Sequence, residues 1–306
     1  MNGEEVIVGV DVGGTNVRMG AVDRNTVLRY DQIFNSRKLS GVDAVDNLLE
    51  LTKSYLRDLS QPVRALSLGF PSTLNKDRSA LINTPNLKGF SNVPIRAIFE
   101  DALGIPIFIN KDATMLLYYD LYKLQLAQNA LVVGIYIGTG IGNSIIIDGT
   151  ELIGSNGVAC ELGHIPVPGR RDLCGCGLRG CMELYAGGKA LERICETDFP
   201  GTDIKKVFVE YGHTPQVQQF VSEIADTVVV EVDILNPDCV VLGGGVLQME
   251  AFPKEILKRE ILEKTRKPIP SSTLRIEFSD GTNPFNGVIG AALYAMKQLD
   301  KGVKEK

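Results

Sequence analysis

The chain repeats one local pattern, in which an apolar strand leads into a turn of glycine and threonine and a second apolar strand follows. Residues 6–12 are almost all apolar and lead into Gly13-Gly14-Thr15. Residues 131–137 lead in the same way into Gly138-Thr139-Gly140-Ile141-Gly142. Each pattern predicts a buried strand that opens a β-hairpin. The repeat predicts an internal duplication of architecture, although not of detailed sequence.

Strand and helix patterns alternate through the rest of the chain. Apolar residues recur at helical spacing in 42–59, 217–235 and 285–299, and short apolar runs at 65–70 and 239–242 read as strands. This alternation predicts an α/β fold. Hydrophobic residues make up 44% of the 306 residues, which is enough for a sizeable core.

The overall charge is mildly acidic, with a formal value of -5 and a pI of about 5.3. Such a surface does not favour binding to nucleic acid or to an anionic membrane. The first five residues are polar and acidic, unlike a secretory signal, and no apolar run approaches the ~18 residues of a membrane span. We expect a cytoplasmic protein that binds neither nucleic acid nor membrane.

Three glycine-rich turns are candidate nucleotide sites. In the first turn, at residues 11–16, backbone N–H groups beside the glycines and the hydroxyl of Thr15 would approach phosphate oxygens. Asp11 would hold Mg²⁺ through water. The second has the spacing Gly-x-Gly-x-Gly before a strand, which does not match a dinucleotide fingerprint. The third follows a short strand and leaves room for a ribose or a flat ring. The residues concerned are Asp11, Gly13, Gly14, Thr15 and Asn16, then Gly138, Thr139 and Gly140, then Gly243, Gly244 and Gly245.

Taken singly, each turn is also explained by an ordinary hairpin or a flexible loop. Their order along the chain, with two hairpin turns and a later glycine run, is the pattern of the actin-like ATPase fold. No P-loop motif is present to compete with this interpretation. ATP with Mg²⁺ is therefore the expected nucleotide ligand.

A cluster of metal-binding residue types lies in the middle of the chain. His164, Cys174, Cys176 and Cys181 form the set of three thiolates and one imidazole that is typical of a closed zinc site. Nearby glycines at 175, 177 and 180 permit the sharp bends of such a loop. Four protein ligands leave no open position, so we predict a structural Zn²⁺. Buried free thiols are the alternative.

Two glutamates flank this cluster. Glu161 lies three residues before the histidine, and Glu183 lies two residues after the last cysteine. A rigid zinc loop would hold both carboxylates near each other, as in a supported substrate site. The alternative is that each is a solvated surface side chain.

These motifs together resemble the ROK family of bacterial sugar kinases and repressors, and the resemblance covers essentially the whole chain. It implies two actin-like (ribonuclease H-like) lobes with a cleft between them. The small lobe would span residues 1–112 and regain the C-terminal helix at about 286–306, and the large lobe would span 113–285 with the zinc loop at 164–181. ATP-Mg²⁺ would bind across the glycine turns, while Glu161, His164 and Glu183 would bind sugar hydroxyls. A homodimer is the implied assembly.

The resemblance also implies a catalytic base. The family commonly has an Asn-Asp-Ala-Asn run after its first lobe, and Asn110-Lys111-Asp112-Ala113-Thr114 occupies that place here. Asp112 would accept the proton of the attacking sugar hydroxyl, beside Asn110 and Lys111 as sugar contacts. Lys111 and Thr114 depart from the family pattern, which puts glucose specificity in doubt. The alternative role for Asp112 is capping of the following helix.

A further stretch narrows the expected sugar. Residues 69–71, 76–77 and 84–87 resemble the sugar-binding loop of bacterial D-allose kinases, with Asn86 as a sugar contact. This similarity predicts phosphorylation of D-allose to D-allose 6-phosphate. Glucose, fructose and N-acetylmannosamine are the alternatives within the family.

Two other classes of protein compete with a kinase. A ROK repressor would carry a helix-turn-helix domain, for which we expect no room before the first strand. A non-catalytic sugar sensor would keep the zinc loop but lose the base or the phosphate turns, all of which are present. The sequence therefore favours an enzyme.

Overall fold

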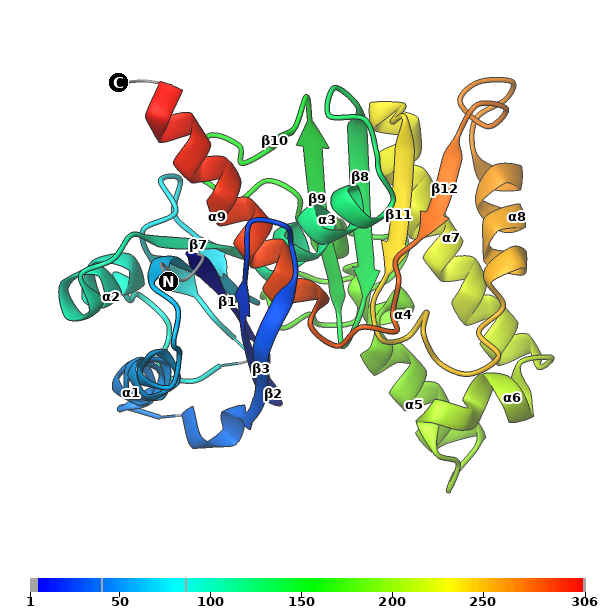
Figure 1. Cartoon of the computed structure of the whole chain (residues 1–306). Coiled ribbons are helices and arrows are strands. Elements are labelled where there is room, and N and C mark those ends of the chain that lie inside the picture. The colour runs from blue at the N-terminus through cyan, green and yellow to red at the C-terminus, as the bar shows by residue number, and fades with distance from the viewer. Residues whose placement is uncertain (1–4, 40, 86, 305–306) are drawn as a thin grey trace. The chain divides into compact units, whose positions relative to one another are not determined.

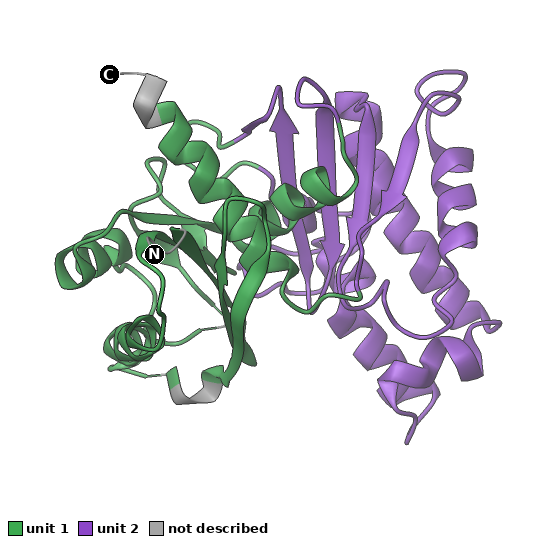
Figure 2. Ribbon diagram, viewed as in Figure 1, with its two compact units in different colours: residues 1–126, 153–159, 282–306 green, residues 127–152, 160–281 purple. Residues whose placement is uncertain are grey.

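The computed structural model describes residues 5–39, 41–85 and 87–304, which form two compact units. The first unit comprises residues 1–126, 153–159 and 282–306, and the second comprises 127–152 and 160–281 (Figure 2). Each unit is built on its own five-stranded sheet with parallel and antiparallel pairs. The expected α/β class is confirmed, with mixed sheets.

The sheet of the first unit has the order β3-β2-β1-β4-β7. Its strands are β1 (Val6–Val12), β2 (Asn16–Val22), β3 (Leu28–Asn35), β4 (Val63–Phe70) and β7 (Ile107–Lys111). Strands β1 and β2 form the predicted antiparallel hairpin. Strand β1 runs parallel to β4, and β4 runs parallel to β7.

Helices cover both faces of this sheet because alternate residues of β1 are buried on opposite sides. Val8 and Val10 pack in one core with α1 (Ala44–Arg57) and α2 (Ile95–Leu103). Ile7 packs in another with α3 (Asp112–Lys123) and α9 (Asn286–Lys304). Burial on both faces explains why β1 is apolar throughout. A small hairpin, β5 (Thr73–Leu74) and β6 (Leu81–Asn83), completes the unit.

The sheet of the second unit has the order β10-β9-β8-β11-β12 (Figure 1). Its strands are β8 (Leu131–Ile137), β9 (Ile141–Ile147), β10 (Thr150–Glu151), β11 (Cys239–Gly243) and β12 (Arg275–Phe278). The second predicted hairpin is β8–β9. The order and the directions of pairing repeat those of the first unit, which confirms the predicted duplication of architecture.

Helices of the second unit share one large core with β8 and β11. These helices are α5 (Gly188–Asp198), α6 (Val207–Tyr211), α7 (Pro215–Leu235) and α8 (Lys254–Lys264). The short helix α4 (Glu183–Ala186) and the 3-10 turns η1 (Ser36–Leu39), η2 (Leu162–His164) and η3 (Ile204–Lys206) complete the described elements. Among the helices in the described part of the chain, none is both long and apolar enough to cross a bilayer.

Candidate active site

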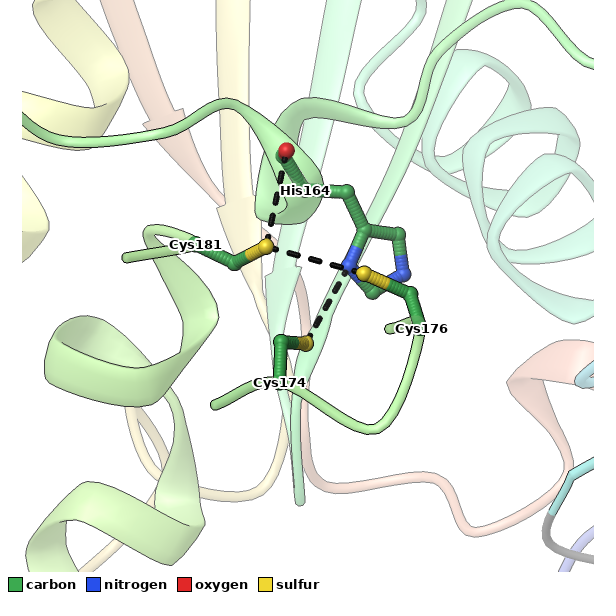
Figure 3. Close-up of side chains that lie close together, drawn as sticks. All are labelled: His164, Cys174, Cys176 and Cys181. Carbon is green, nitrogen blue, oxygen red and sulfur yellow. Dashed lines mark hydrogen bonds between the residues drawn. The ribbon is translucent and has the colours of Figure 1, made fainter. Parts of the chain in front are cut away.

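The predicted zinc ligands come together in the second unit. The ligand atoms of His164, Cys174, Cys176 and Cys181 all lie within 4.8 Å of one another, and Figure 3 shows the imidazole turned toward the three sulfurs. The two Sγ atoms of Cys176 and Cys181 are 3.6 Å apart, and Cys174 Sγ is 3.7 Å from His164 Nδ1. Tetrahedral zinc, about 2.3 Å from sulfur and 2.0 Å from nitrogen, spaces its ligand atoms about 3.5–3.8 Å apart. The donor set and its spacing therefore fit a structural zinc ion.

Glycines shape the loop that carries the cysteines. Gly177 and Gly180 have φ angles of +91° and +75°, a region that favours glycine. A Cβ on Gly180 would also lie 2.7 Å from the carbonyl oxygen of Arg170. Gly175 is in neither situation, since it has open space and no positive φ. Two of the three glycines predicted to permit bends are thus required by the backbone.

The thiols at this centre have unequal acidities. Burial raises the pKa of Cys174 to about 12 and also raises the pKa of Cys181. Burial opposes ionisation of Cys176 as well, but hydrogen bonds from the Leu178 N–H and the neighbouring thiols lower its pKa. Three thiolates so close together need a compensating positive charge, which a divalent cation would provide.

Both predicted sugar-binding glutamates lie beside the same imidazole. Glu183 is the first residue of α4, and its Oε1 accepts a hydrogen bond from Cys174 Sγ at 3.3 Å and lies 3.7 Å from His164 Nδ1. Glu161 Oε2 is 4.0 Å from the other ring nitrogen, Nε2. The structure therefore brings together the three side chains that the sequence grouped as a sugar site. The Nδ1 atom of the imidazole lies toward Cys174 and Glu183, and its Nε2 atom lies toward Glu161.

The second and third glycine turns also meet within this unit. A Cβ on Gly244 would lie 2.4 Å from the carbonyl oxygen of Ile137, the residue just before Gly138, and Val246 N donates to that oxygen at 3.0 Å. Gly138 itself would meet nothing within 4 Å if it carried a Cβ. Protein packing therefore does not require glycine at position 138, whereas a ligand against the backbone would.

One pair of glycines beside this turn, Gly187 and Gly188, was not singled out by the sequence patterns. Gly188 N and Lys189 N, at the start of α5, donate to the carbonyl oxygens of Gly138 and Thr139 at 2.8 and 3.0 Å. A Cβ on Gly188 would lie 2.4 Å from Gly138 O, and one on Gly187 would lie 3.2 Å from the Cα of Gly140. The signal was a Gly-Gly pair directly before a helical segment.

The first glycine turn lies in the other unit, beside the proposed base. Arg18 Nη1 donates a hydrogen bond to Asp11 Oδ2 at 3.3 Å. Burial and the neighbouring charge of Asp112 raise the pKa of Asp11 to about 6, with Arg18 acting in the opposite direction. Two carboxylates therefore interact at the ends of strands β1 and β7. Gly14 has open space where a Cβ would project, and Gly13 N donates to Asn16 O at 2.9 Å.

Asp112, the proposed base, and the two residues before it each make a hydrogen bond with the backbone. Asp112 is the first residue of α3, and its Oδ1 accepts a hydrogen bond from Ala113 N at 2.7 Å, so it also serves the helix terminus. Asn110 is fully buried, and its Oδ1 accepts a hydrogen bond from Lys111 N at 2.8 Å. Lys111 Nζ donates to a backbone carbonyl at 3.0 Å. Asn86 lies outside the described residues.

Comparisons with known proteins agree with this arrangement. The sequence model of the ROK family matches residues 7–298. An N-acetylmannosamine kinase of Salmonella typhi is 27% identical over 293 residues, which cover 94% of this chain and 97% of that protein. A ROK hexokinase from Thermus thermophilus has a TM-score of 0.79 at 28% identity, covering 97% and 99% of the two chains.

A ROK glucokinase from Streptomyces griseus, solved with glucose and AMPPNP, has a TM-score of 0.78 at 22% identity and covers 95% of this chain and 99% of that one. At that identity the likeness concerns the fold. The family model matches the sequence itself across both glycine hairpins, the cysteine loop and most of the C-terminal helix. The chain belongs to the ROK family.

Proposed function

We propose that this protein is an ATP-dependent kinase of a free hexose. The observation that carries the proposal is that the carboxylates of Glu161 and Glu183 both lie beside the imidazole of His164, which is itself part of the zinc-type cluster. Carboxylates and an imidazole supply the acceptors and donors that sugar hydroxyls require. Family membership and the sugar-kinase names of the relatives support the enzyme class.

Phosphoryl transfer in this proposal uses Asp112 as the base. The carboxylate of Asp112 accepts the proton of the sugar hydroxyl while that oxygen forms a bond to the γ-phosphorus. The bond from the γ-phosphorus to the bridging oxygen breaks, and ADP leaves. The interaction of Asp112 with Asp11 supports this role, because it places a second carboxylate beside the base.

The nucleotide would lie along the glycine turns. Gly14, Gly138 and Gly245 would meet no protein atom within 4 Å if they carried a Cβ, so backbone at all three is open to a ligand. Thr15, Asn16, Thr139 and Gly243 belong to the same turns. Mg²⁺, held by Asp11 through water, would supply charge neutralisation of the phosphates. The fit rests on Asp11, whose pKa is raised to about 6 by burial and by the neighbouring charge of Asp112, so that a cation bound beside the two carboxylates would be favourable.

Zinc would be held by His164, Cys174, Cys176 and Cys181 and would act structurally. Four protein ligands leave no position for substrate. Its contribution would be to orient the imidazole and to fix the cysteine loop, in which Cys174 Sγ lies 3.3 Å from Glu183 Oε1.

Within the hexose class we propose D-allose as the substrate. The proposal rests on the sequence similarity of residues 69–87 to D-allose kinases and includes Asn86 and Asn110 as sugar contacts, while Lys111 Nζ donates to the Ala159 carbonyl. N-acetylmannosamine is the second candidate, because relatives over nearly the full chain carry that activity in their names. Glucose is the third, on the same basis.

A coupled assay of ADP formation tests both levels. The protein is given ATP, Mg²⁺ and one of D-allose, D-glucose, D-fructose, D-mannose or N-acetylmannosamine, and the sugars are ranked by kcat/KM. We expect turnover with D-allose ranked first. A different leading sugar would overturn D-allose and keep the kinase, whereas absence of sugar-dependent ADP formation with all five would contradict the kinase.

A further inference from the structure

A short segment of the chain belongs to the first unit although the chain on both sides of it belongs to the second. Residues Ile153–Ala159 have this property, and we call them the strap (Figure 2). The strap follows β10 and leads directly into Cys160 and then Glu161. The place where the strap is held therefore determines where the segment that carries Glu161 and His164 begins.

Two cationic side chains of the first unit hold the strap by its backbone. Lys111 Nζ donates to the carbonyl oxygen of Ala159 at 3.0 Å, and Arg78 Nη1 donates to that of Gly157 at 2.8 Å. Arg78 is only 7% exposed, so its bond is shielded from water. Hydrogen bonds from a charged donor are about twice as strong as neutral ones.

The strap is also seated sterically. Gly157 is buried, while Asn156 and Val158 on either side of it are exposed. A Cβ on Gly157 would lie 2.7 Å from the backbone of Asn75 and Lys76, and its φ of +87° favours glycine. The turn beneath it is stiffened, because Asn75 Oδ1 accepts hydrogen bonds from Ser79 N and Ala80 N at 2.9 Å each.

The held carbonyl lies at the last residue of the strap. Ala159 N donates back to Ile153 O at 3.2 Å, which closes the strap into a loop. The next residue, Cys160, has a φ of +64°, so the chain turns sharply as it leaves. Glu161 is two residues beyond the held carbonyl, and Lys111 is the residue directly before Asp112.

We propose that Lys111 and Arg78 are positioning residues that clamp the strap and thereby fix the point at which the Glu161–His164 segment begins. This inference rests on the proposed sugar site. In this role the lysine ammonium acts on a peptide carbonyl and sets the placement of Glu161. A clamp of this kind strengthens the binding of any sugar that uses Glu161, whatever its epimer.

Steady-state kinetics of clamp variants test the proposal. Lys111→Met removes the donor, and we expect the KM of each accepted sugar to rise by the same factor, about 10- to 100-fold, with kcat changed much less. Lys111→Arg keeps a donor and should recover most of the loss. Arg78→Met should raise the same KM, with Arg78→Lys as the folded alternative if Arg78→Met does not fold. Lys301→Met, an exposed lysine on α9, is the matched control and should leave KM unchanged.

Hydrogen exchange gives a readout that is independent of catalysis. The amide of Ala159 is protected by its bond to Ile153 O, and this protection should fall in Lys111→Met and return in Lys111→Arg. If wild-type protein phosphorylates no sugar, the proposed function fails, while the exchange result still decides whether the clamp exists. A changed ranking of sugars in Lys111→Met would overturn the inference in favour of direct sugar contact, and so would unchanged KM together with unchanged exchange.

Discussion

The sheet of the first unit runs β3-β2-β1-β4-β7 and that of the second runs β10-β9-β8-β11-β12, with the same sequence of antiparallel and parallel pairings. The two differ at the end of the central hairpin. Asp11 is the penultimate residue of β1 and pairs across the hairpin with Arg18. Tyr136 is the penultimate residue of β8 and pairs with Gly142.

This difference gives the two copies of one scaffold different proposed roles. In the first unit the position carries a charge that interacts with Asp112. In the second unit Tyr136 is buried and fills the space beside Gly243, where a Cβ would lie 2.7 Å from the tyrosine ring. The second unit instead carries the zinc-type cluster and the glutamates. The duplicated sheet thus carries the proposed base in one copy and the proposed sugar-binding side chains in the other.

Removal of the proposed base would break the first half of this comparison most severely. In Asp112→Asn the side chain no longer accepts a proton, and we expect kcat to fall by about 10²–10⁴-fold. Sugar affinity, measured by calorimetry without ATP, should change little, because the proposed sugar side chains of the second unit are intact. Asp101→Asn, on the exposed side of α2, is the control. Retained turnover in Asp112→Asn would show that another group is the base.

Loss of the metal would break the second half. Cys176→Ser should lower the zinc content from one per chain and weaken sugar affinity by about 10–100-fold, because the cysteine loop no longer holds Glu183 and His164. Metal analysis and calorimetry measure the two quantities. Cys195→Ala changes a cysteine of α5 outside the cluster and should keep both the metal and the affinity. Unchanged sugar affinity in metal-free protein would contradict the ordering role of zinc.

Substitution of glycines would sharpen the comparison of the two turns. In the second unit, Gly188→Ala forces a Cβ to within 2.4 Å of the Gly138 carbonyl oxygen, and we expect the free energy of unfolding to fall by about 1–3 kcal/mol. In the first unit, Gly14→Ala meets no protein atom within 4 Å, so stability should be unchanged and any loss should be in the KM for ATP. Denaturant melts and kinetics with varied ATP distinguish the two. An equal loss of stability in both variants would contradict this reading.

The hairpins and the ligand set could be predicted from the sequence because their signals are local. Apolar strands, glycine turns and the spacing of His164, Cys174, Cys176 and Cys181 depend on neighbours along the chain, and the family match confirms the kinase family that they indicated. Contacts between distant residues left no such signal. Lys111 reaches a carbonyl 48 residues away, and the Gly187-Gly188 pair matters only because α5 returns to the turn at 138–140.

Some elements also lacked a pattern of their own. Strand β7 is short and ends in the polar residues Asn110 and Lys111, and β12 has only four residues with one fully buried. Helix α8 is mostly charged, with buried residues only at Leu257 and Ile261. Each is stabilised by its place beside β4, β11 or α7 rather than by periodicity within its own residues.

The smallest effect concerns the pH dependence of stability in the first unit. Burial and Asp112 raise the pKa of Asp11 to about 6, above its ordinary value of 3.8. Between those two pH values folded Asp11 keeps a proton that the unfolded chain has released, so this group makes the free energy of unfolding decrease as the pH rises. Asp11→Asn removes that loss. We expect the variant to gain about 1–2 kcal/mol over wild type at pH 7.5 without added Mg²⁺, and nothing below about pH 4.

Asp23, the residue directly after β2, provides a control of opposite sign. Burial tends to raise its pKa, but hydrogen bonds from Val27 N and Arg29 outweigh that effect and lower it. Its ionised form therefore stabilises the fold, and Asp23→Asn should cost stability at neutral pH, with the cost fading as the pH falls through the acidic range. Denaturant melts from pH 3.5 to 8 give both differences. If Asp11→Asn and Asp23→Asn changed stability with the same sign at pH 7.5, the electrostatic distinction between the turn and the rest of its sheet would be wrong, and Asp11 would be one more carboxylate that the fold itself satisfies.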